Sequence, residues 1–517
     1  MSLSPLRTMR DVLGGGGPDS AAVCVIDNGR IETEWSRHEL AGRVQKLGAQ
    51  LQQFGIGPGD AVSIAMGNTK DYIVAFLAAT WIRAIAAPLN PGYKTDEFSF
   101  FMEDAKSKVL IVEEGIGNKF AEKAAEKLKI PVWFYGNGES RTASKNLLSP
   151  YVIVDPPIPT DVALYLHTSG TTSRPKLVPL SHHNLCTSMG NIRNTYQLDH
   201  TDRSYVVMPL FHVHGLVGAL FSTLSSGGTV ILPKAGKFSA TVFWNDIVSC
   251  RATWYTAVPT IHQILLARAD QDKESINSAQ LRFIRSCSSP LAAPVLGRLE
   301  ATFHAPVLEA YAMTEASHQM TSNPLPSMGP HKPGSVGRPM NVQLAILDDK
   351  DNVVSTPKVV GNVCIRGENV TKGYQNRPEA NISDFSSGWF HTGDQGYLDV
   401  EGYLYLTGRT KEIINRGGEK IAPVEIDNVL LTHPDIQQAV AFAGPSEKYG
   451  QEVCCAVVFV QSKNLTAKQI QEHCASKLAK EKVPSRIFIT DSIPKTATGK
   501  VQRRFVAAKF LQPSAKL

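Results

Sequence analysis

Hydrophobic positions along the chain follow two alternating periods. Apolar side chains over residues 40–51 recur at the spacing of an amphipathic helix. A segment rich in Gly and Pro (55–60) ends that helix, and the short apolar run 61–65 is typical of a buried strand. The apolar stretch 72–82 is too short for the ~20 residues of a membrane-spanning helix, so it predicts a buried helix.

Strand-like and helical segments continue to alternate through the first 400 residues. This alternation predicts α/β architecture, with sheets covered on both faces in a large N-terminal domain. An apolar run at 162–166 predicts a strand that leads into a polar loop. Further strands are predicted at 109–112, 205–207, 230–232 and 281–284.

The pattern changes near residue 400, where glycines separate short strands such as 403–406. From about 411 onwards it predicts a small α+β domain. We place the boundary at 409–411, which gives an N-terminal domain of 1–409 and a C-terminal domain of 410–517. The small domain is expected to contain helices at 423–431 and 467–478 and strands at 438–442 and 453–460.

A loop rich in hydroxyl groups follows the strand at 162–166. Hydroxyl and backbone N–H donors in such a loop can wrap a polyphosphate, and a lysine adds a point charge. The loop differs from a Walker A loop because Pro175 precedes the lysine. Its candidate phosphate ligands are Thr168, Ser169, Gly170, Thr171, Thr172, Ser173 and Lys176.

Three later segments suit the same ligand. The segment 309–315 (EAYAMTE) offers an aromatic ring for a base, a hydroxyl for a phosphate and a carboxylate for Mg²⁺. Asp394 in WFHTGD and Arg409 after Gly408 suit ribose hydroxyls. The segment 494–500 (PKTATGK) presents a lysine on a loop.

Together these segments resemble the adenylate-forming superfamily of acyl-CoA synthetases, luciferases and peptide-synthetase adenylation domains. The resemblance covers essentially the whole chain. Within the superfamily the chain is most similar to the oxalate-activating acyl-CoA synthetases of plants and fungi. That likeness rests on 208–215 (MPLFHVHG), 252–263 (ATWYTAVPTIHQ), 282–291 (RFIRSCSSPL) and 310–326 (AYAMTEASHQMTSNPLP).

The resemblance implies a two-step reaction in which a carboxylate and ATP form an acyl-adenylate, and coenzyme A then displaces AMP. ATP, Mg²⁺ and coenzyme A are the implied cofactors and co-substrates. The implied catalytic residues are Lys500, Thr314, Glu315 and His212, with Glu315 also the Mg²⁺ ligand. The implied ATP and AMP contacts are the 168–176 loop, Glu309, Ala310, Tyr311, Thr314, Asp394, Arg409 and Lys500.

The second step needs a different geometry, because Lys500 would crowd the path of the thiol. The family rotates its small domain about a hinge, which Lys411 matches here. Rotation is expected to bring Gly417, Gly418, Glu419 and Lys420 to coenzyme A. The paired glycines would let the backbone pass close to the pantetheine arm.

Two positions depart from the family pattern. Leu177 follows the loop lysine where relatives have glycine. It excludes an easy positive φ, so it either shifts the loop or lies in β conformation. Ala312 also replaces a common glycine, and its methyl group is expected to narrow the acyl pocket.

The expected acyl pocket is polar, with His212, His214, Ser288, Ser289, Ala312 and His318 near the acyl group. A long-chain or aromatic acid would leave buried polar groups unpaired, at about 1–3 kcal/mol each. Protonated histidines could also attract a second carboxylate. The hypothesis is therefore oxalate, with malonate or another short acid next.

Three other functions stay open. The first is a ligase for medium-chain acids or hydroxycinnamates such as 4-coumarate, which Ser288, Ser289 and His318 do not favour. The second is an adenylation domain that loads a carrier protein. The third is a non-catalytic binding protein, including an RNA binder, against which Lys500 and Glu315 argue. Zinc binding by 212–214 (HVH) is not favoured, since no partnering His/Cys cluster is visible.

Composition adds few constraints. The formal charge of +6 on 517 residues suits an anionic small molecule or an ordinary solvated surface, and no basic block indicates nucleic-acid binding. The 8 cysteines are scattered without a CxxC motif, which indicates reduced intracellular thiols. The terminal Ala515-Lys516-Leu517 resembles a peroxisomal address read by an import receptor, so peroxisome or cytosol is expected.

Overall fold

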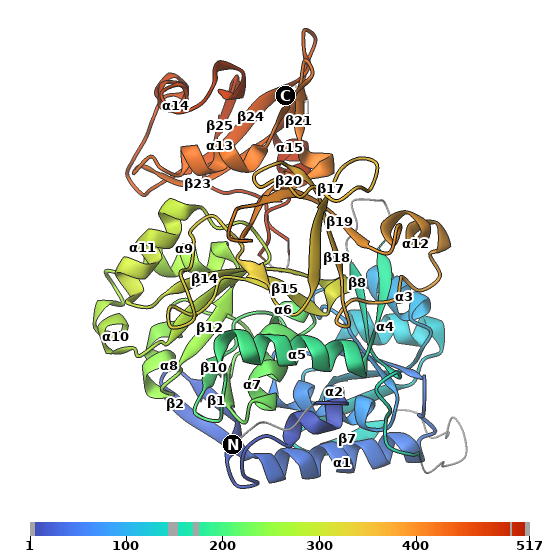
Figure 1. Ribbon diagram of the computed structural model, residues 1–517. Helices are drawn as coiled ribbons and strands as arrows, with labels where there is room; N and C mark the ends of the chain where they lie inside the picture. The colour runs from blue at the N-terminus through green and yellow to red at the C-terminus, as the bar shows by residue number, and fades with distance from the viewer. Residues whose placement is uncertain (1–5, 143–153, 169–174, 497–498, 512–517) are drawn as a thin grey trace.

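The computed structural model describes residues 6–142, 154–168, 175–496 and 499–511. The phosphate-loop residues 169–173 and the C-terminal address at 515–517 lie outside this range. A large domain of stacked sheets and helices carries a smaller domain at one end (Figure 1). The expected α/β architecture with a small α+β domain is confirmed.

One sheet of the large domain has seven strands, with parallel pairing in its centre and an antiparallel strand at each edge. In spatial order the strands are β7 (Glu139–Thr142), β6 (Val132–Gly136), β5 (Ser107–Glu113), β3 (Ala61–Ala65), β4 (Ile85–Pro88), β8 (Val162–Thr168) and β9 (Lys176–Ser181).

The second sheet has nine strands, and its six central strands are parallel to one another. In spatial order the strands are β16 (Arg338–Pro339), β15 (His318–Ser322), β14 (Val307–Met313), β13 (Phe283–Cys287), β12 (Trp254–Ala257), β10 (Arg203–Tyr205), β11 (Thr229–Pro233), β1 (Ala21–Asp27) and β2 (Arg30–Ser36).

Helices between the two sheets form the main core, because one cluster of buried apolar residues joins both sheets to these helices. The helices and turns of this layer are η1 (Met9–Leu13), α1 (Arg37–Gln53), α2 (Lys70–Trp81), α5 (His182–Tyr196), α6 (Val213–Gly215), the π-helical turn η2 (Leu216–Phe221) and α7 (Ser222–Ser225).

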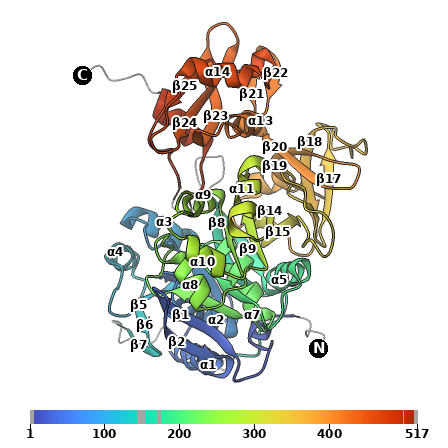
Figure 2. The ribbon, with the colours of Figure 1, turned by 90° about the vertical axis from the view of Figure 1, so that its left-hand side faces the viewer.

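Other helices cover the outer face of each sheet (Figure 2). The nine-stranded sheet packs against α8 (Phe243–Ser249), α9 (Pro259–Ala267), α10 (Lys273–Ser278) and α11 (Ala293–Phe303). The seven-stranded sheet packs against α3 (Thr95–Asp104) and α4 (Lys119–Leu128). Both faces of both sheets are therefore buried, as apolar parallel strands require.

A four-stranded antiparallel sheet completes the large domain and leads into the small one. Its strands are β17 (Gln343–Leu347), β18 (Gly361–Arg366), β19 (Phe390–Leu398) and β20 (Leu404–Arg409), with α12 (Pro378–Asp384) inserted between β18 and β19. The short turn η4 (Thr410–Glu412) follows β20 and holds the predicted hinge residue Lys411.

The small domain is one sheet with apolar clusters on both faces. Its strands are β22 (Glu419–Ile421), β21 (Ile414–Arg416), β24 (Gly450–Phe459), β23 (Ile436–Ser446) and β25 (Arg486–Ile489). Its helices and turns are α13 (Pro423–Leu430), α14 (Ala467–Ala475), η5 (Lys480–Lys482) and α15 (Arg503–Leu511).

Local sequence signals set several element ends. Ser36 and Glu39 form a capping box that starts α1, and Ser181 with Asn184 does the same for α5. The predicted strand at 61–65 matches β3, whereas the helix predicted at 467–478 ends at Ala475. Among the described residues, no helix is both long and apolar enough to cross a bilayer.

Gly337 illustrates how tightly the large domain packs beside strand β15. It has a φ of +82°, and a Cβ there would lie 1.8 Å from the carbonyl carbon of Ser322 at the end of β15. Only glycine fits this position, because a methyl group would push backbone against backbone.

We predict that Gly337→Ala lowers the free energy of unfolding by about 2–5 kcal/mol, from the left-handed backbone and the overpacking together. Urea unfolding followed by tryptophan fluorescence measures the change. Gly297→Ala in α11 is the control, because its Cβ would meet no atom within 4 Å. Equal midpoints for the two variants would contradict the packing argument.

Candidate active site

The lysine loop (residues 494–500, of which 494–496 and 499–500 are described) contacts the large domain through Gly499 and Lys500. The carbonyl of Gly499 accepts a hydrogen bond of 2.9 Å from Thr260 Oγ1 in α9. The next residue, Lys500, places its Nζ 3.3 Å from Nε2 of His212. Burial lowers the pKa of Lys500 to about 8, so most of its amine still carries a proton at pH 7.

Five side chains from the nine-stranded sheet and the adjoining helical layer form a polar cluster: His214, Thr256, Arg285, Ser288 and His318. His214 Nε2 lies 2.7 Å from Thr256 Oγ1, and its Nδ1 lies 3.0 Å from Ser288 Oγ. The rings of His214 and His318 meet edge to face at 5.3 Å. The charge of Lys500 acts on both histidines, which places the cluster beside the lysine loop.

His318 is unusual in both backbone and side chain. Its φ is +119°, which a residue with a Cβ rarely adopts. Both ring nitrogens are buried, and neither has a hydrogen-bond partner among the described residues. Gly218 in η2 faces the ring, since a Cβ there would lie 2.4 Å from Nε2 of His318. Backbone strain and unpaired buried polar atoms are features that cluster at functional sites.

The prediction that the histidines carry positive charge is wrong for the free protein. Burial and the nearby cations hold the pKa values of His212, His214 and His318 well below the ordinary range. These imidazoles are therefore neutral at pH 7 and act as hydrogen-bonding groups. The fixed positive charges beside them are Arg285 and Lys500.

Strand β14 leads from this cluster to a second group of predicted residues. The hydroxyl of Tyr311 donates to the carboxylate of Asp394 on β19. Asp394 also pairs with Arg409 on β20, at 3.3 Å between Oδ1 and Nε, and the two residues face each other in the strand register. Burial raises the pKa of Asp394, and Arg409 opposes that rise. Tyrosine, carboxylate and guanidinium thus form one connected group.

Glu315 lies in the short turn η3 (Thr314–Ala316) that follows β14, and it is buried. Its Oε1 accepts a hydrogen bond of 3.0 Å from Tyr374, and burial raises its pKa. Lys176 lies over the Tyr374 ring at 4.4 Å and pairs with Asp384 at 2.6 Å. A buried carboxylate and a loop lysine therefore flank the same tyrosine.

The remaining predicted residues lie on β14 and β8, in η3 and directly after β13. Glu309 is buried and its carboxylate accepts a hydrogen bond of 2.9 Å from the Gly334 N–H, so its side chain supports that neighbouring turn. Burial raises the pKa of Glu309 to about 8. Thr168 ends β8, Ala310 and Ala312 lie on β14, Thr314 begins η3, and Ser289 follows Ser288.

Leu177 lies in β9 and is buried, and its carbonyl accepts a hydrogen bond of 2.9 Å from Gln375 N. The second expectation for this residue, a β conformation, is confirmed. A leucine here packs into the core of the sheet without needing a positive φ.

Comparison with known proteins identifies the family of this site. The AMP-binding enzyme family model matches residues 16–375, and the model for the C-terminal domain of AMP-binding enzymes matches 425–500. The chain is 51% identical to oxalate–CoA ligase of Arabidopsis thaliana over 96% of each chain. It is 47% identical to oxalate–CoA ligase of Saccharomyces cerevisiae over 88% of each chain.

The chain belongs to the AMP-binding enzyme family.

Solved structures agree with this assignment. The crystal structure of ATP-bound MatB from Rhodopseudomonas palustris superposes with a TM-score of 0.87 at 26% identity, over 98% of this chain and 99% of that chain. The apo form of the same protein gives a lower TM-score of 0.77, at 27% identity over 97% and 98% of the two chains. The overall structure of this AMP-binding enzyme is therefore more similar to the ATP-bound form.

This arrangement does not bring the predicted coenzyme A residues to the site. Gly417, Gly418, Glu419 and Lys420 are exposed in the β21–β22 hairpin. The hairpin lies at the end of the small domain that faces away from the large domain (Figures 1 and 2). The Gly417 N–H donates to the carbonyl of Tyr449, which holds the turn against the next loop. Lysine loop and hairpin thus occupy opposite ends of the small domain.

Sequence reasoning missed several residues that connect the site. Arg285 is fully buried on β13, and a charged residue inside the apolar strand FIRSC is the signal that could have revealed it. Tyr374 and Gly218 carried no comparable signal, because their roles depend on contacts between distant segments.

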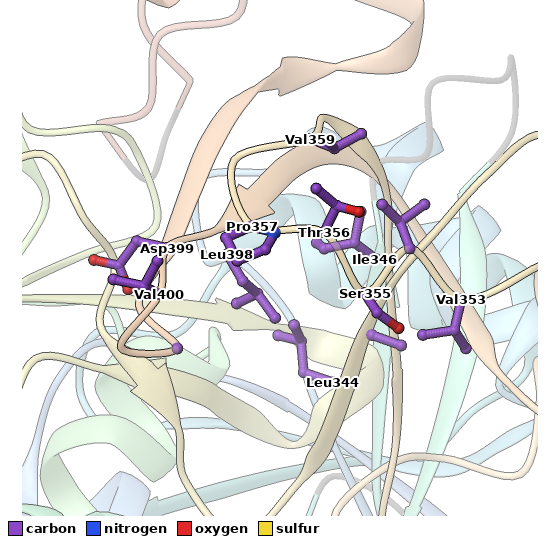
Figure 3. A pocket seen from close by; sticks show the side chains of 13 residues that line it. Leu344, Ile346, Val353, Ser355, Thr356, Pro357, Val359, Leu398, Asp399 and Val400 are labelled. Carbon is purple, nitrogen blue, oxygen red and sulfur yellow. The ribbon is translucent and has the colours of Figure 1, made fainter.

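An apolar hollow lies elsewhere in the large domain. Leu344, Ile346 and Val353 on one side face Leu398 and Val400 on the other (Figure 3). None of the predicted site residues lines this hollow. It is separate from the chemistry described above.

We predict that Lys500 titrates near pH 8 in the free protein. Labelling with dinitrofluorobenzene at a series of pH values, read by peptide mass spectrometry, measures the midpoint. The side chain of Lys468 is 84% exposed and serves as the reference. An ordinary lysine titrates near pH 10.4, about two units higher. A Lys500 midpoint equal to that of Lys468 would contradict its burial.

Proposed function

We propose that this protein is an AMP-forming acid–thiol ligase that converts oxalate, ATP and coenzyme A into oxalyl-CoA, AMP and pyrophosphate. The observation that carries the choice of acid is the polar cluster. A hydroxyl, two neutral imidazoles and a buried guanidinium suit a short, doubly charged acid. The two oxalate–CoA ligases that resemble the chain over most of its length support the same choice.

In the first step, one oxalate oxygen attacks the α-phosphorus of ATP and pyrophosphate leaves. Negative charge builds up on the phosphate oxygens, so fixed cations and donors lower the barrier. Lys500 is charged at pH 7 and is suited to bridge the carboxylate and the α-phosphate. Thr314 would donate to the same phosphate, and Lys176 with the 168–176 loop would hold the outer phosphates.

The group formed by Tyr311, Asp394 and Arg409 suits the nucleoside. Arg409 and the hydroxyl of Tyr311 hold the Asp394 carboxylate in place. A positioned carboxylate can accept hydrogen bonds from both ribose hydroxyls. The ring of Tyr311 then flanks the base.

Glu315 suits Mg²⁺ because its buried carboxylate offers the oxygen ligand that a hard cation prefers. Within the described part of the chain, no three His, Cys, Asp or Glu side chains are grouped to hold a metal. Phosphate oxygens and water would therefore complete the coordination. Bound Mg²⁺ would offset phosphate charge.

In the second step, the thiol of coenzyme A attacks the acyl carbon and AMP leaves. Lys500 beside His212 would crowd the path of the thiol, so this step requires the small domain to move. Rotation near residue 410, with Lys411 at the hinge, would withdraw the lysine loop. The hairpin with Gly417 and Gly418 would then approach the pantetheine arm, and Glu419 and Lys420 would follow it.

We predict that oxalate gives the fastest AMP formation among oxalate, malonate, acetate, hexanoate and 4-coumarate, with Mg²⁺, ATP and coenzyme A present. Lys500→Ala should slow oxalate-dependent pyrophosphate release by about 100-fold or more, as loss of one preorganised donor does elsewhere. Lys468→Ala is the surface control. A preference for hexanoate or 4-coumarate would keep the ligase and reject oxalate.

A second prediction concerns the fit around His318. Gly218→Ala should raise KM for oxalate at least about 10-fold, because the new methyl group displaces the ring and about 1–3 kcal/mol of hydrogen bonding is lost. KM for ATP should not change.

The matched control is Gly190→Ala in α5, whose Cβ would meet no atom within 4 Å. Steady-state AMP formation at varied oxalate measures both variants. If Gly218→Ala and Gly190→Ala have the same KM for oxalate, contact between His318 and oxalate is excluded.

A further inference from the structure

Arg285 is a buried cation that has no carboxylate partner among the described residues. It is fully buried on β13, and its guanidinium donates to Tyr196 Oη at 2.8 Å, Thr256 Oγ1 at 3.2 Å and Gln319 Oε1 at 3.1 Å. The ion pairs of the described residues include none to Arg285. An uncompensated charge is costly inside a protein, so an anion is expected nearby.

Thr256 connects this cation to His214. Thr256 and Arg285 are direct partners in the parallel register of β12 and β13, so their side chains project from the same face. Arg285 can only donate, and Thr256 Oγ1 accepts its hydrogen bond. The single hydroxyl proton of Thr256 is then free to donate to Nε2 of His214 at 2.7 Å.

This direction fixes the tautomer of His214. With Nε2 as acceptor, the neutral imidazole carries its proton on Nδ1. Nδ1–H therefore donates to Ser288 Oγ, 3.0 Å away. The opposite tautomer would leave the Thr256 hydroxyl proton without an acceptor, because its oxygen has no other partner among the described residues.

The hydrogen bonds that run from Arg285 through Thr256 to His214 form a relay, and this relay ends at the hydroxyl of Ser288. Since its oxygen already accepts from His214, its proton is free to donate. Ser288 has a φ of +74°, a left-handed conformation that few residues with a Cβ adopt and that sets the direction of its side chain. The ring of His318, whose nitrogens have no partner among the described residues, meets the His214 ring edge to face at 5.3 Å.

We infer that Arg285 is a positioning residue for the acid substrate: through Thr256 it fixes the His214 tautomer that turns the Ser288 hydroxyl towards the distal carboxylate of a short diacid. The inference rests on the proposed function for the identity of the acid. Arg285 also supplies the positive potential that the neutral histidines lack.

The test compares Thr256→Val with Thr256→Ser. Valine preserves the shape and removes the hydroxyl, whereas serine preserves the hydroxyl. We expect KM for oxalate to rise about 10- to 100-fold in Thr256→Val and to stay within about threefold of wild type in Thr256→Ser. KM for ATP should remain unchanged in both. If KM for ATP rises as much as KM for oxalate in Thr256→Val, the role of Thr256 is structural and the inference is overturned.

A second readout does not need substrate. Long-range ¹H–¹⁵N spectra of the ¹⁵N-histidine-labelled protein report which ring nitrogen carries the proton, and His214→Gln assigns the signal. We expect the His214 proton on Nδ1 in wild type and Thr256→Ser, and on Nε2 or exchanging between the nitrogens in Thr256→Val. A proton that stays on Nδ1 in Thr256→Val would overturn the relay.

Arg285→Met tests the source of the relay. We expect the same change in tautomer and a larger rise in KM for oxalate than Thr256→Val gives, because the charge is lost as well. If Arg285→Met does not fold, the Thr256 pair still decides the question. A wild-type enzyme that rejects oxalate but keeps the Nδ1 tautomer would refute the proposed substrate alone, and the KM comparison then uses the acid that it accepts.

Discussion

The parallel pairing of β12, β13 and β14 is the constraint on which the site depends. Parallel strands bring their carboxyl ends to one edge of a sheet. Thr256, Arg285 and Leu308 lie in successive register positions, and Ser288 and Tyr311 follow at the carboxyl end of their strands. Because both faces of this sheet are buried, a shift of register would turn polar residues into the apolar core.

The side chains of the site differ in charge, and this difference sets what each can bind. Arg285 and Lys500 supply positive charge, whereas burial keeps His212, His214 and His318 neutral. A neutral imidazole donates a hydrogen bond from one ring nitrogen and accepts one at the other, so its tautomer depends on the partners around it. Such a site favours a small anion with several acceptors over an acyl chain that would leave donors unpaired.

The position of the small domain links this chemistry to motion. Gly499 and Lys500 contact the large domain, while the β21–β22 hairpin faces away from it (Figure 1). Two loops at opposite ends of one rigid sheet cannot reach the same site at once. In the proposed two-step reaction, a change of a few backbone angles in the short turn η4 between β20 and β21 would exchange them.

The sequence by itself determined the α/β class, the small C-terminal domain and the segments that carry Lys176, Glu315, Asp394 and Lys500. These features are local, because the period of the hydrophobic residues and the short motifs predict them from neighbouring positions in the sequence. Strand β3 and helix α2 followed from apolar runs of the right length. The position of Leu177 in a strand was one of two open alternatives until the fold was known.

Only the tertiary structure decided which side chains meet and which carry charge. His214 and His318 are neutral because both are buried and because Arg285 lies near them. These three residues are far apart in the chain. The fit of Gly218 against His318 joins a π-helical turn to a strand across 100 residues of sequence. Burial, hydrogen-bond direction and the distance between charges are properties of packed neighbours, and no local pattern in one sequence contains them.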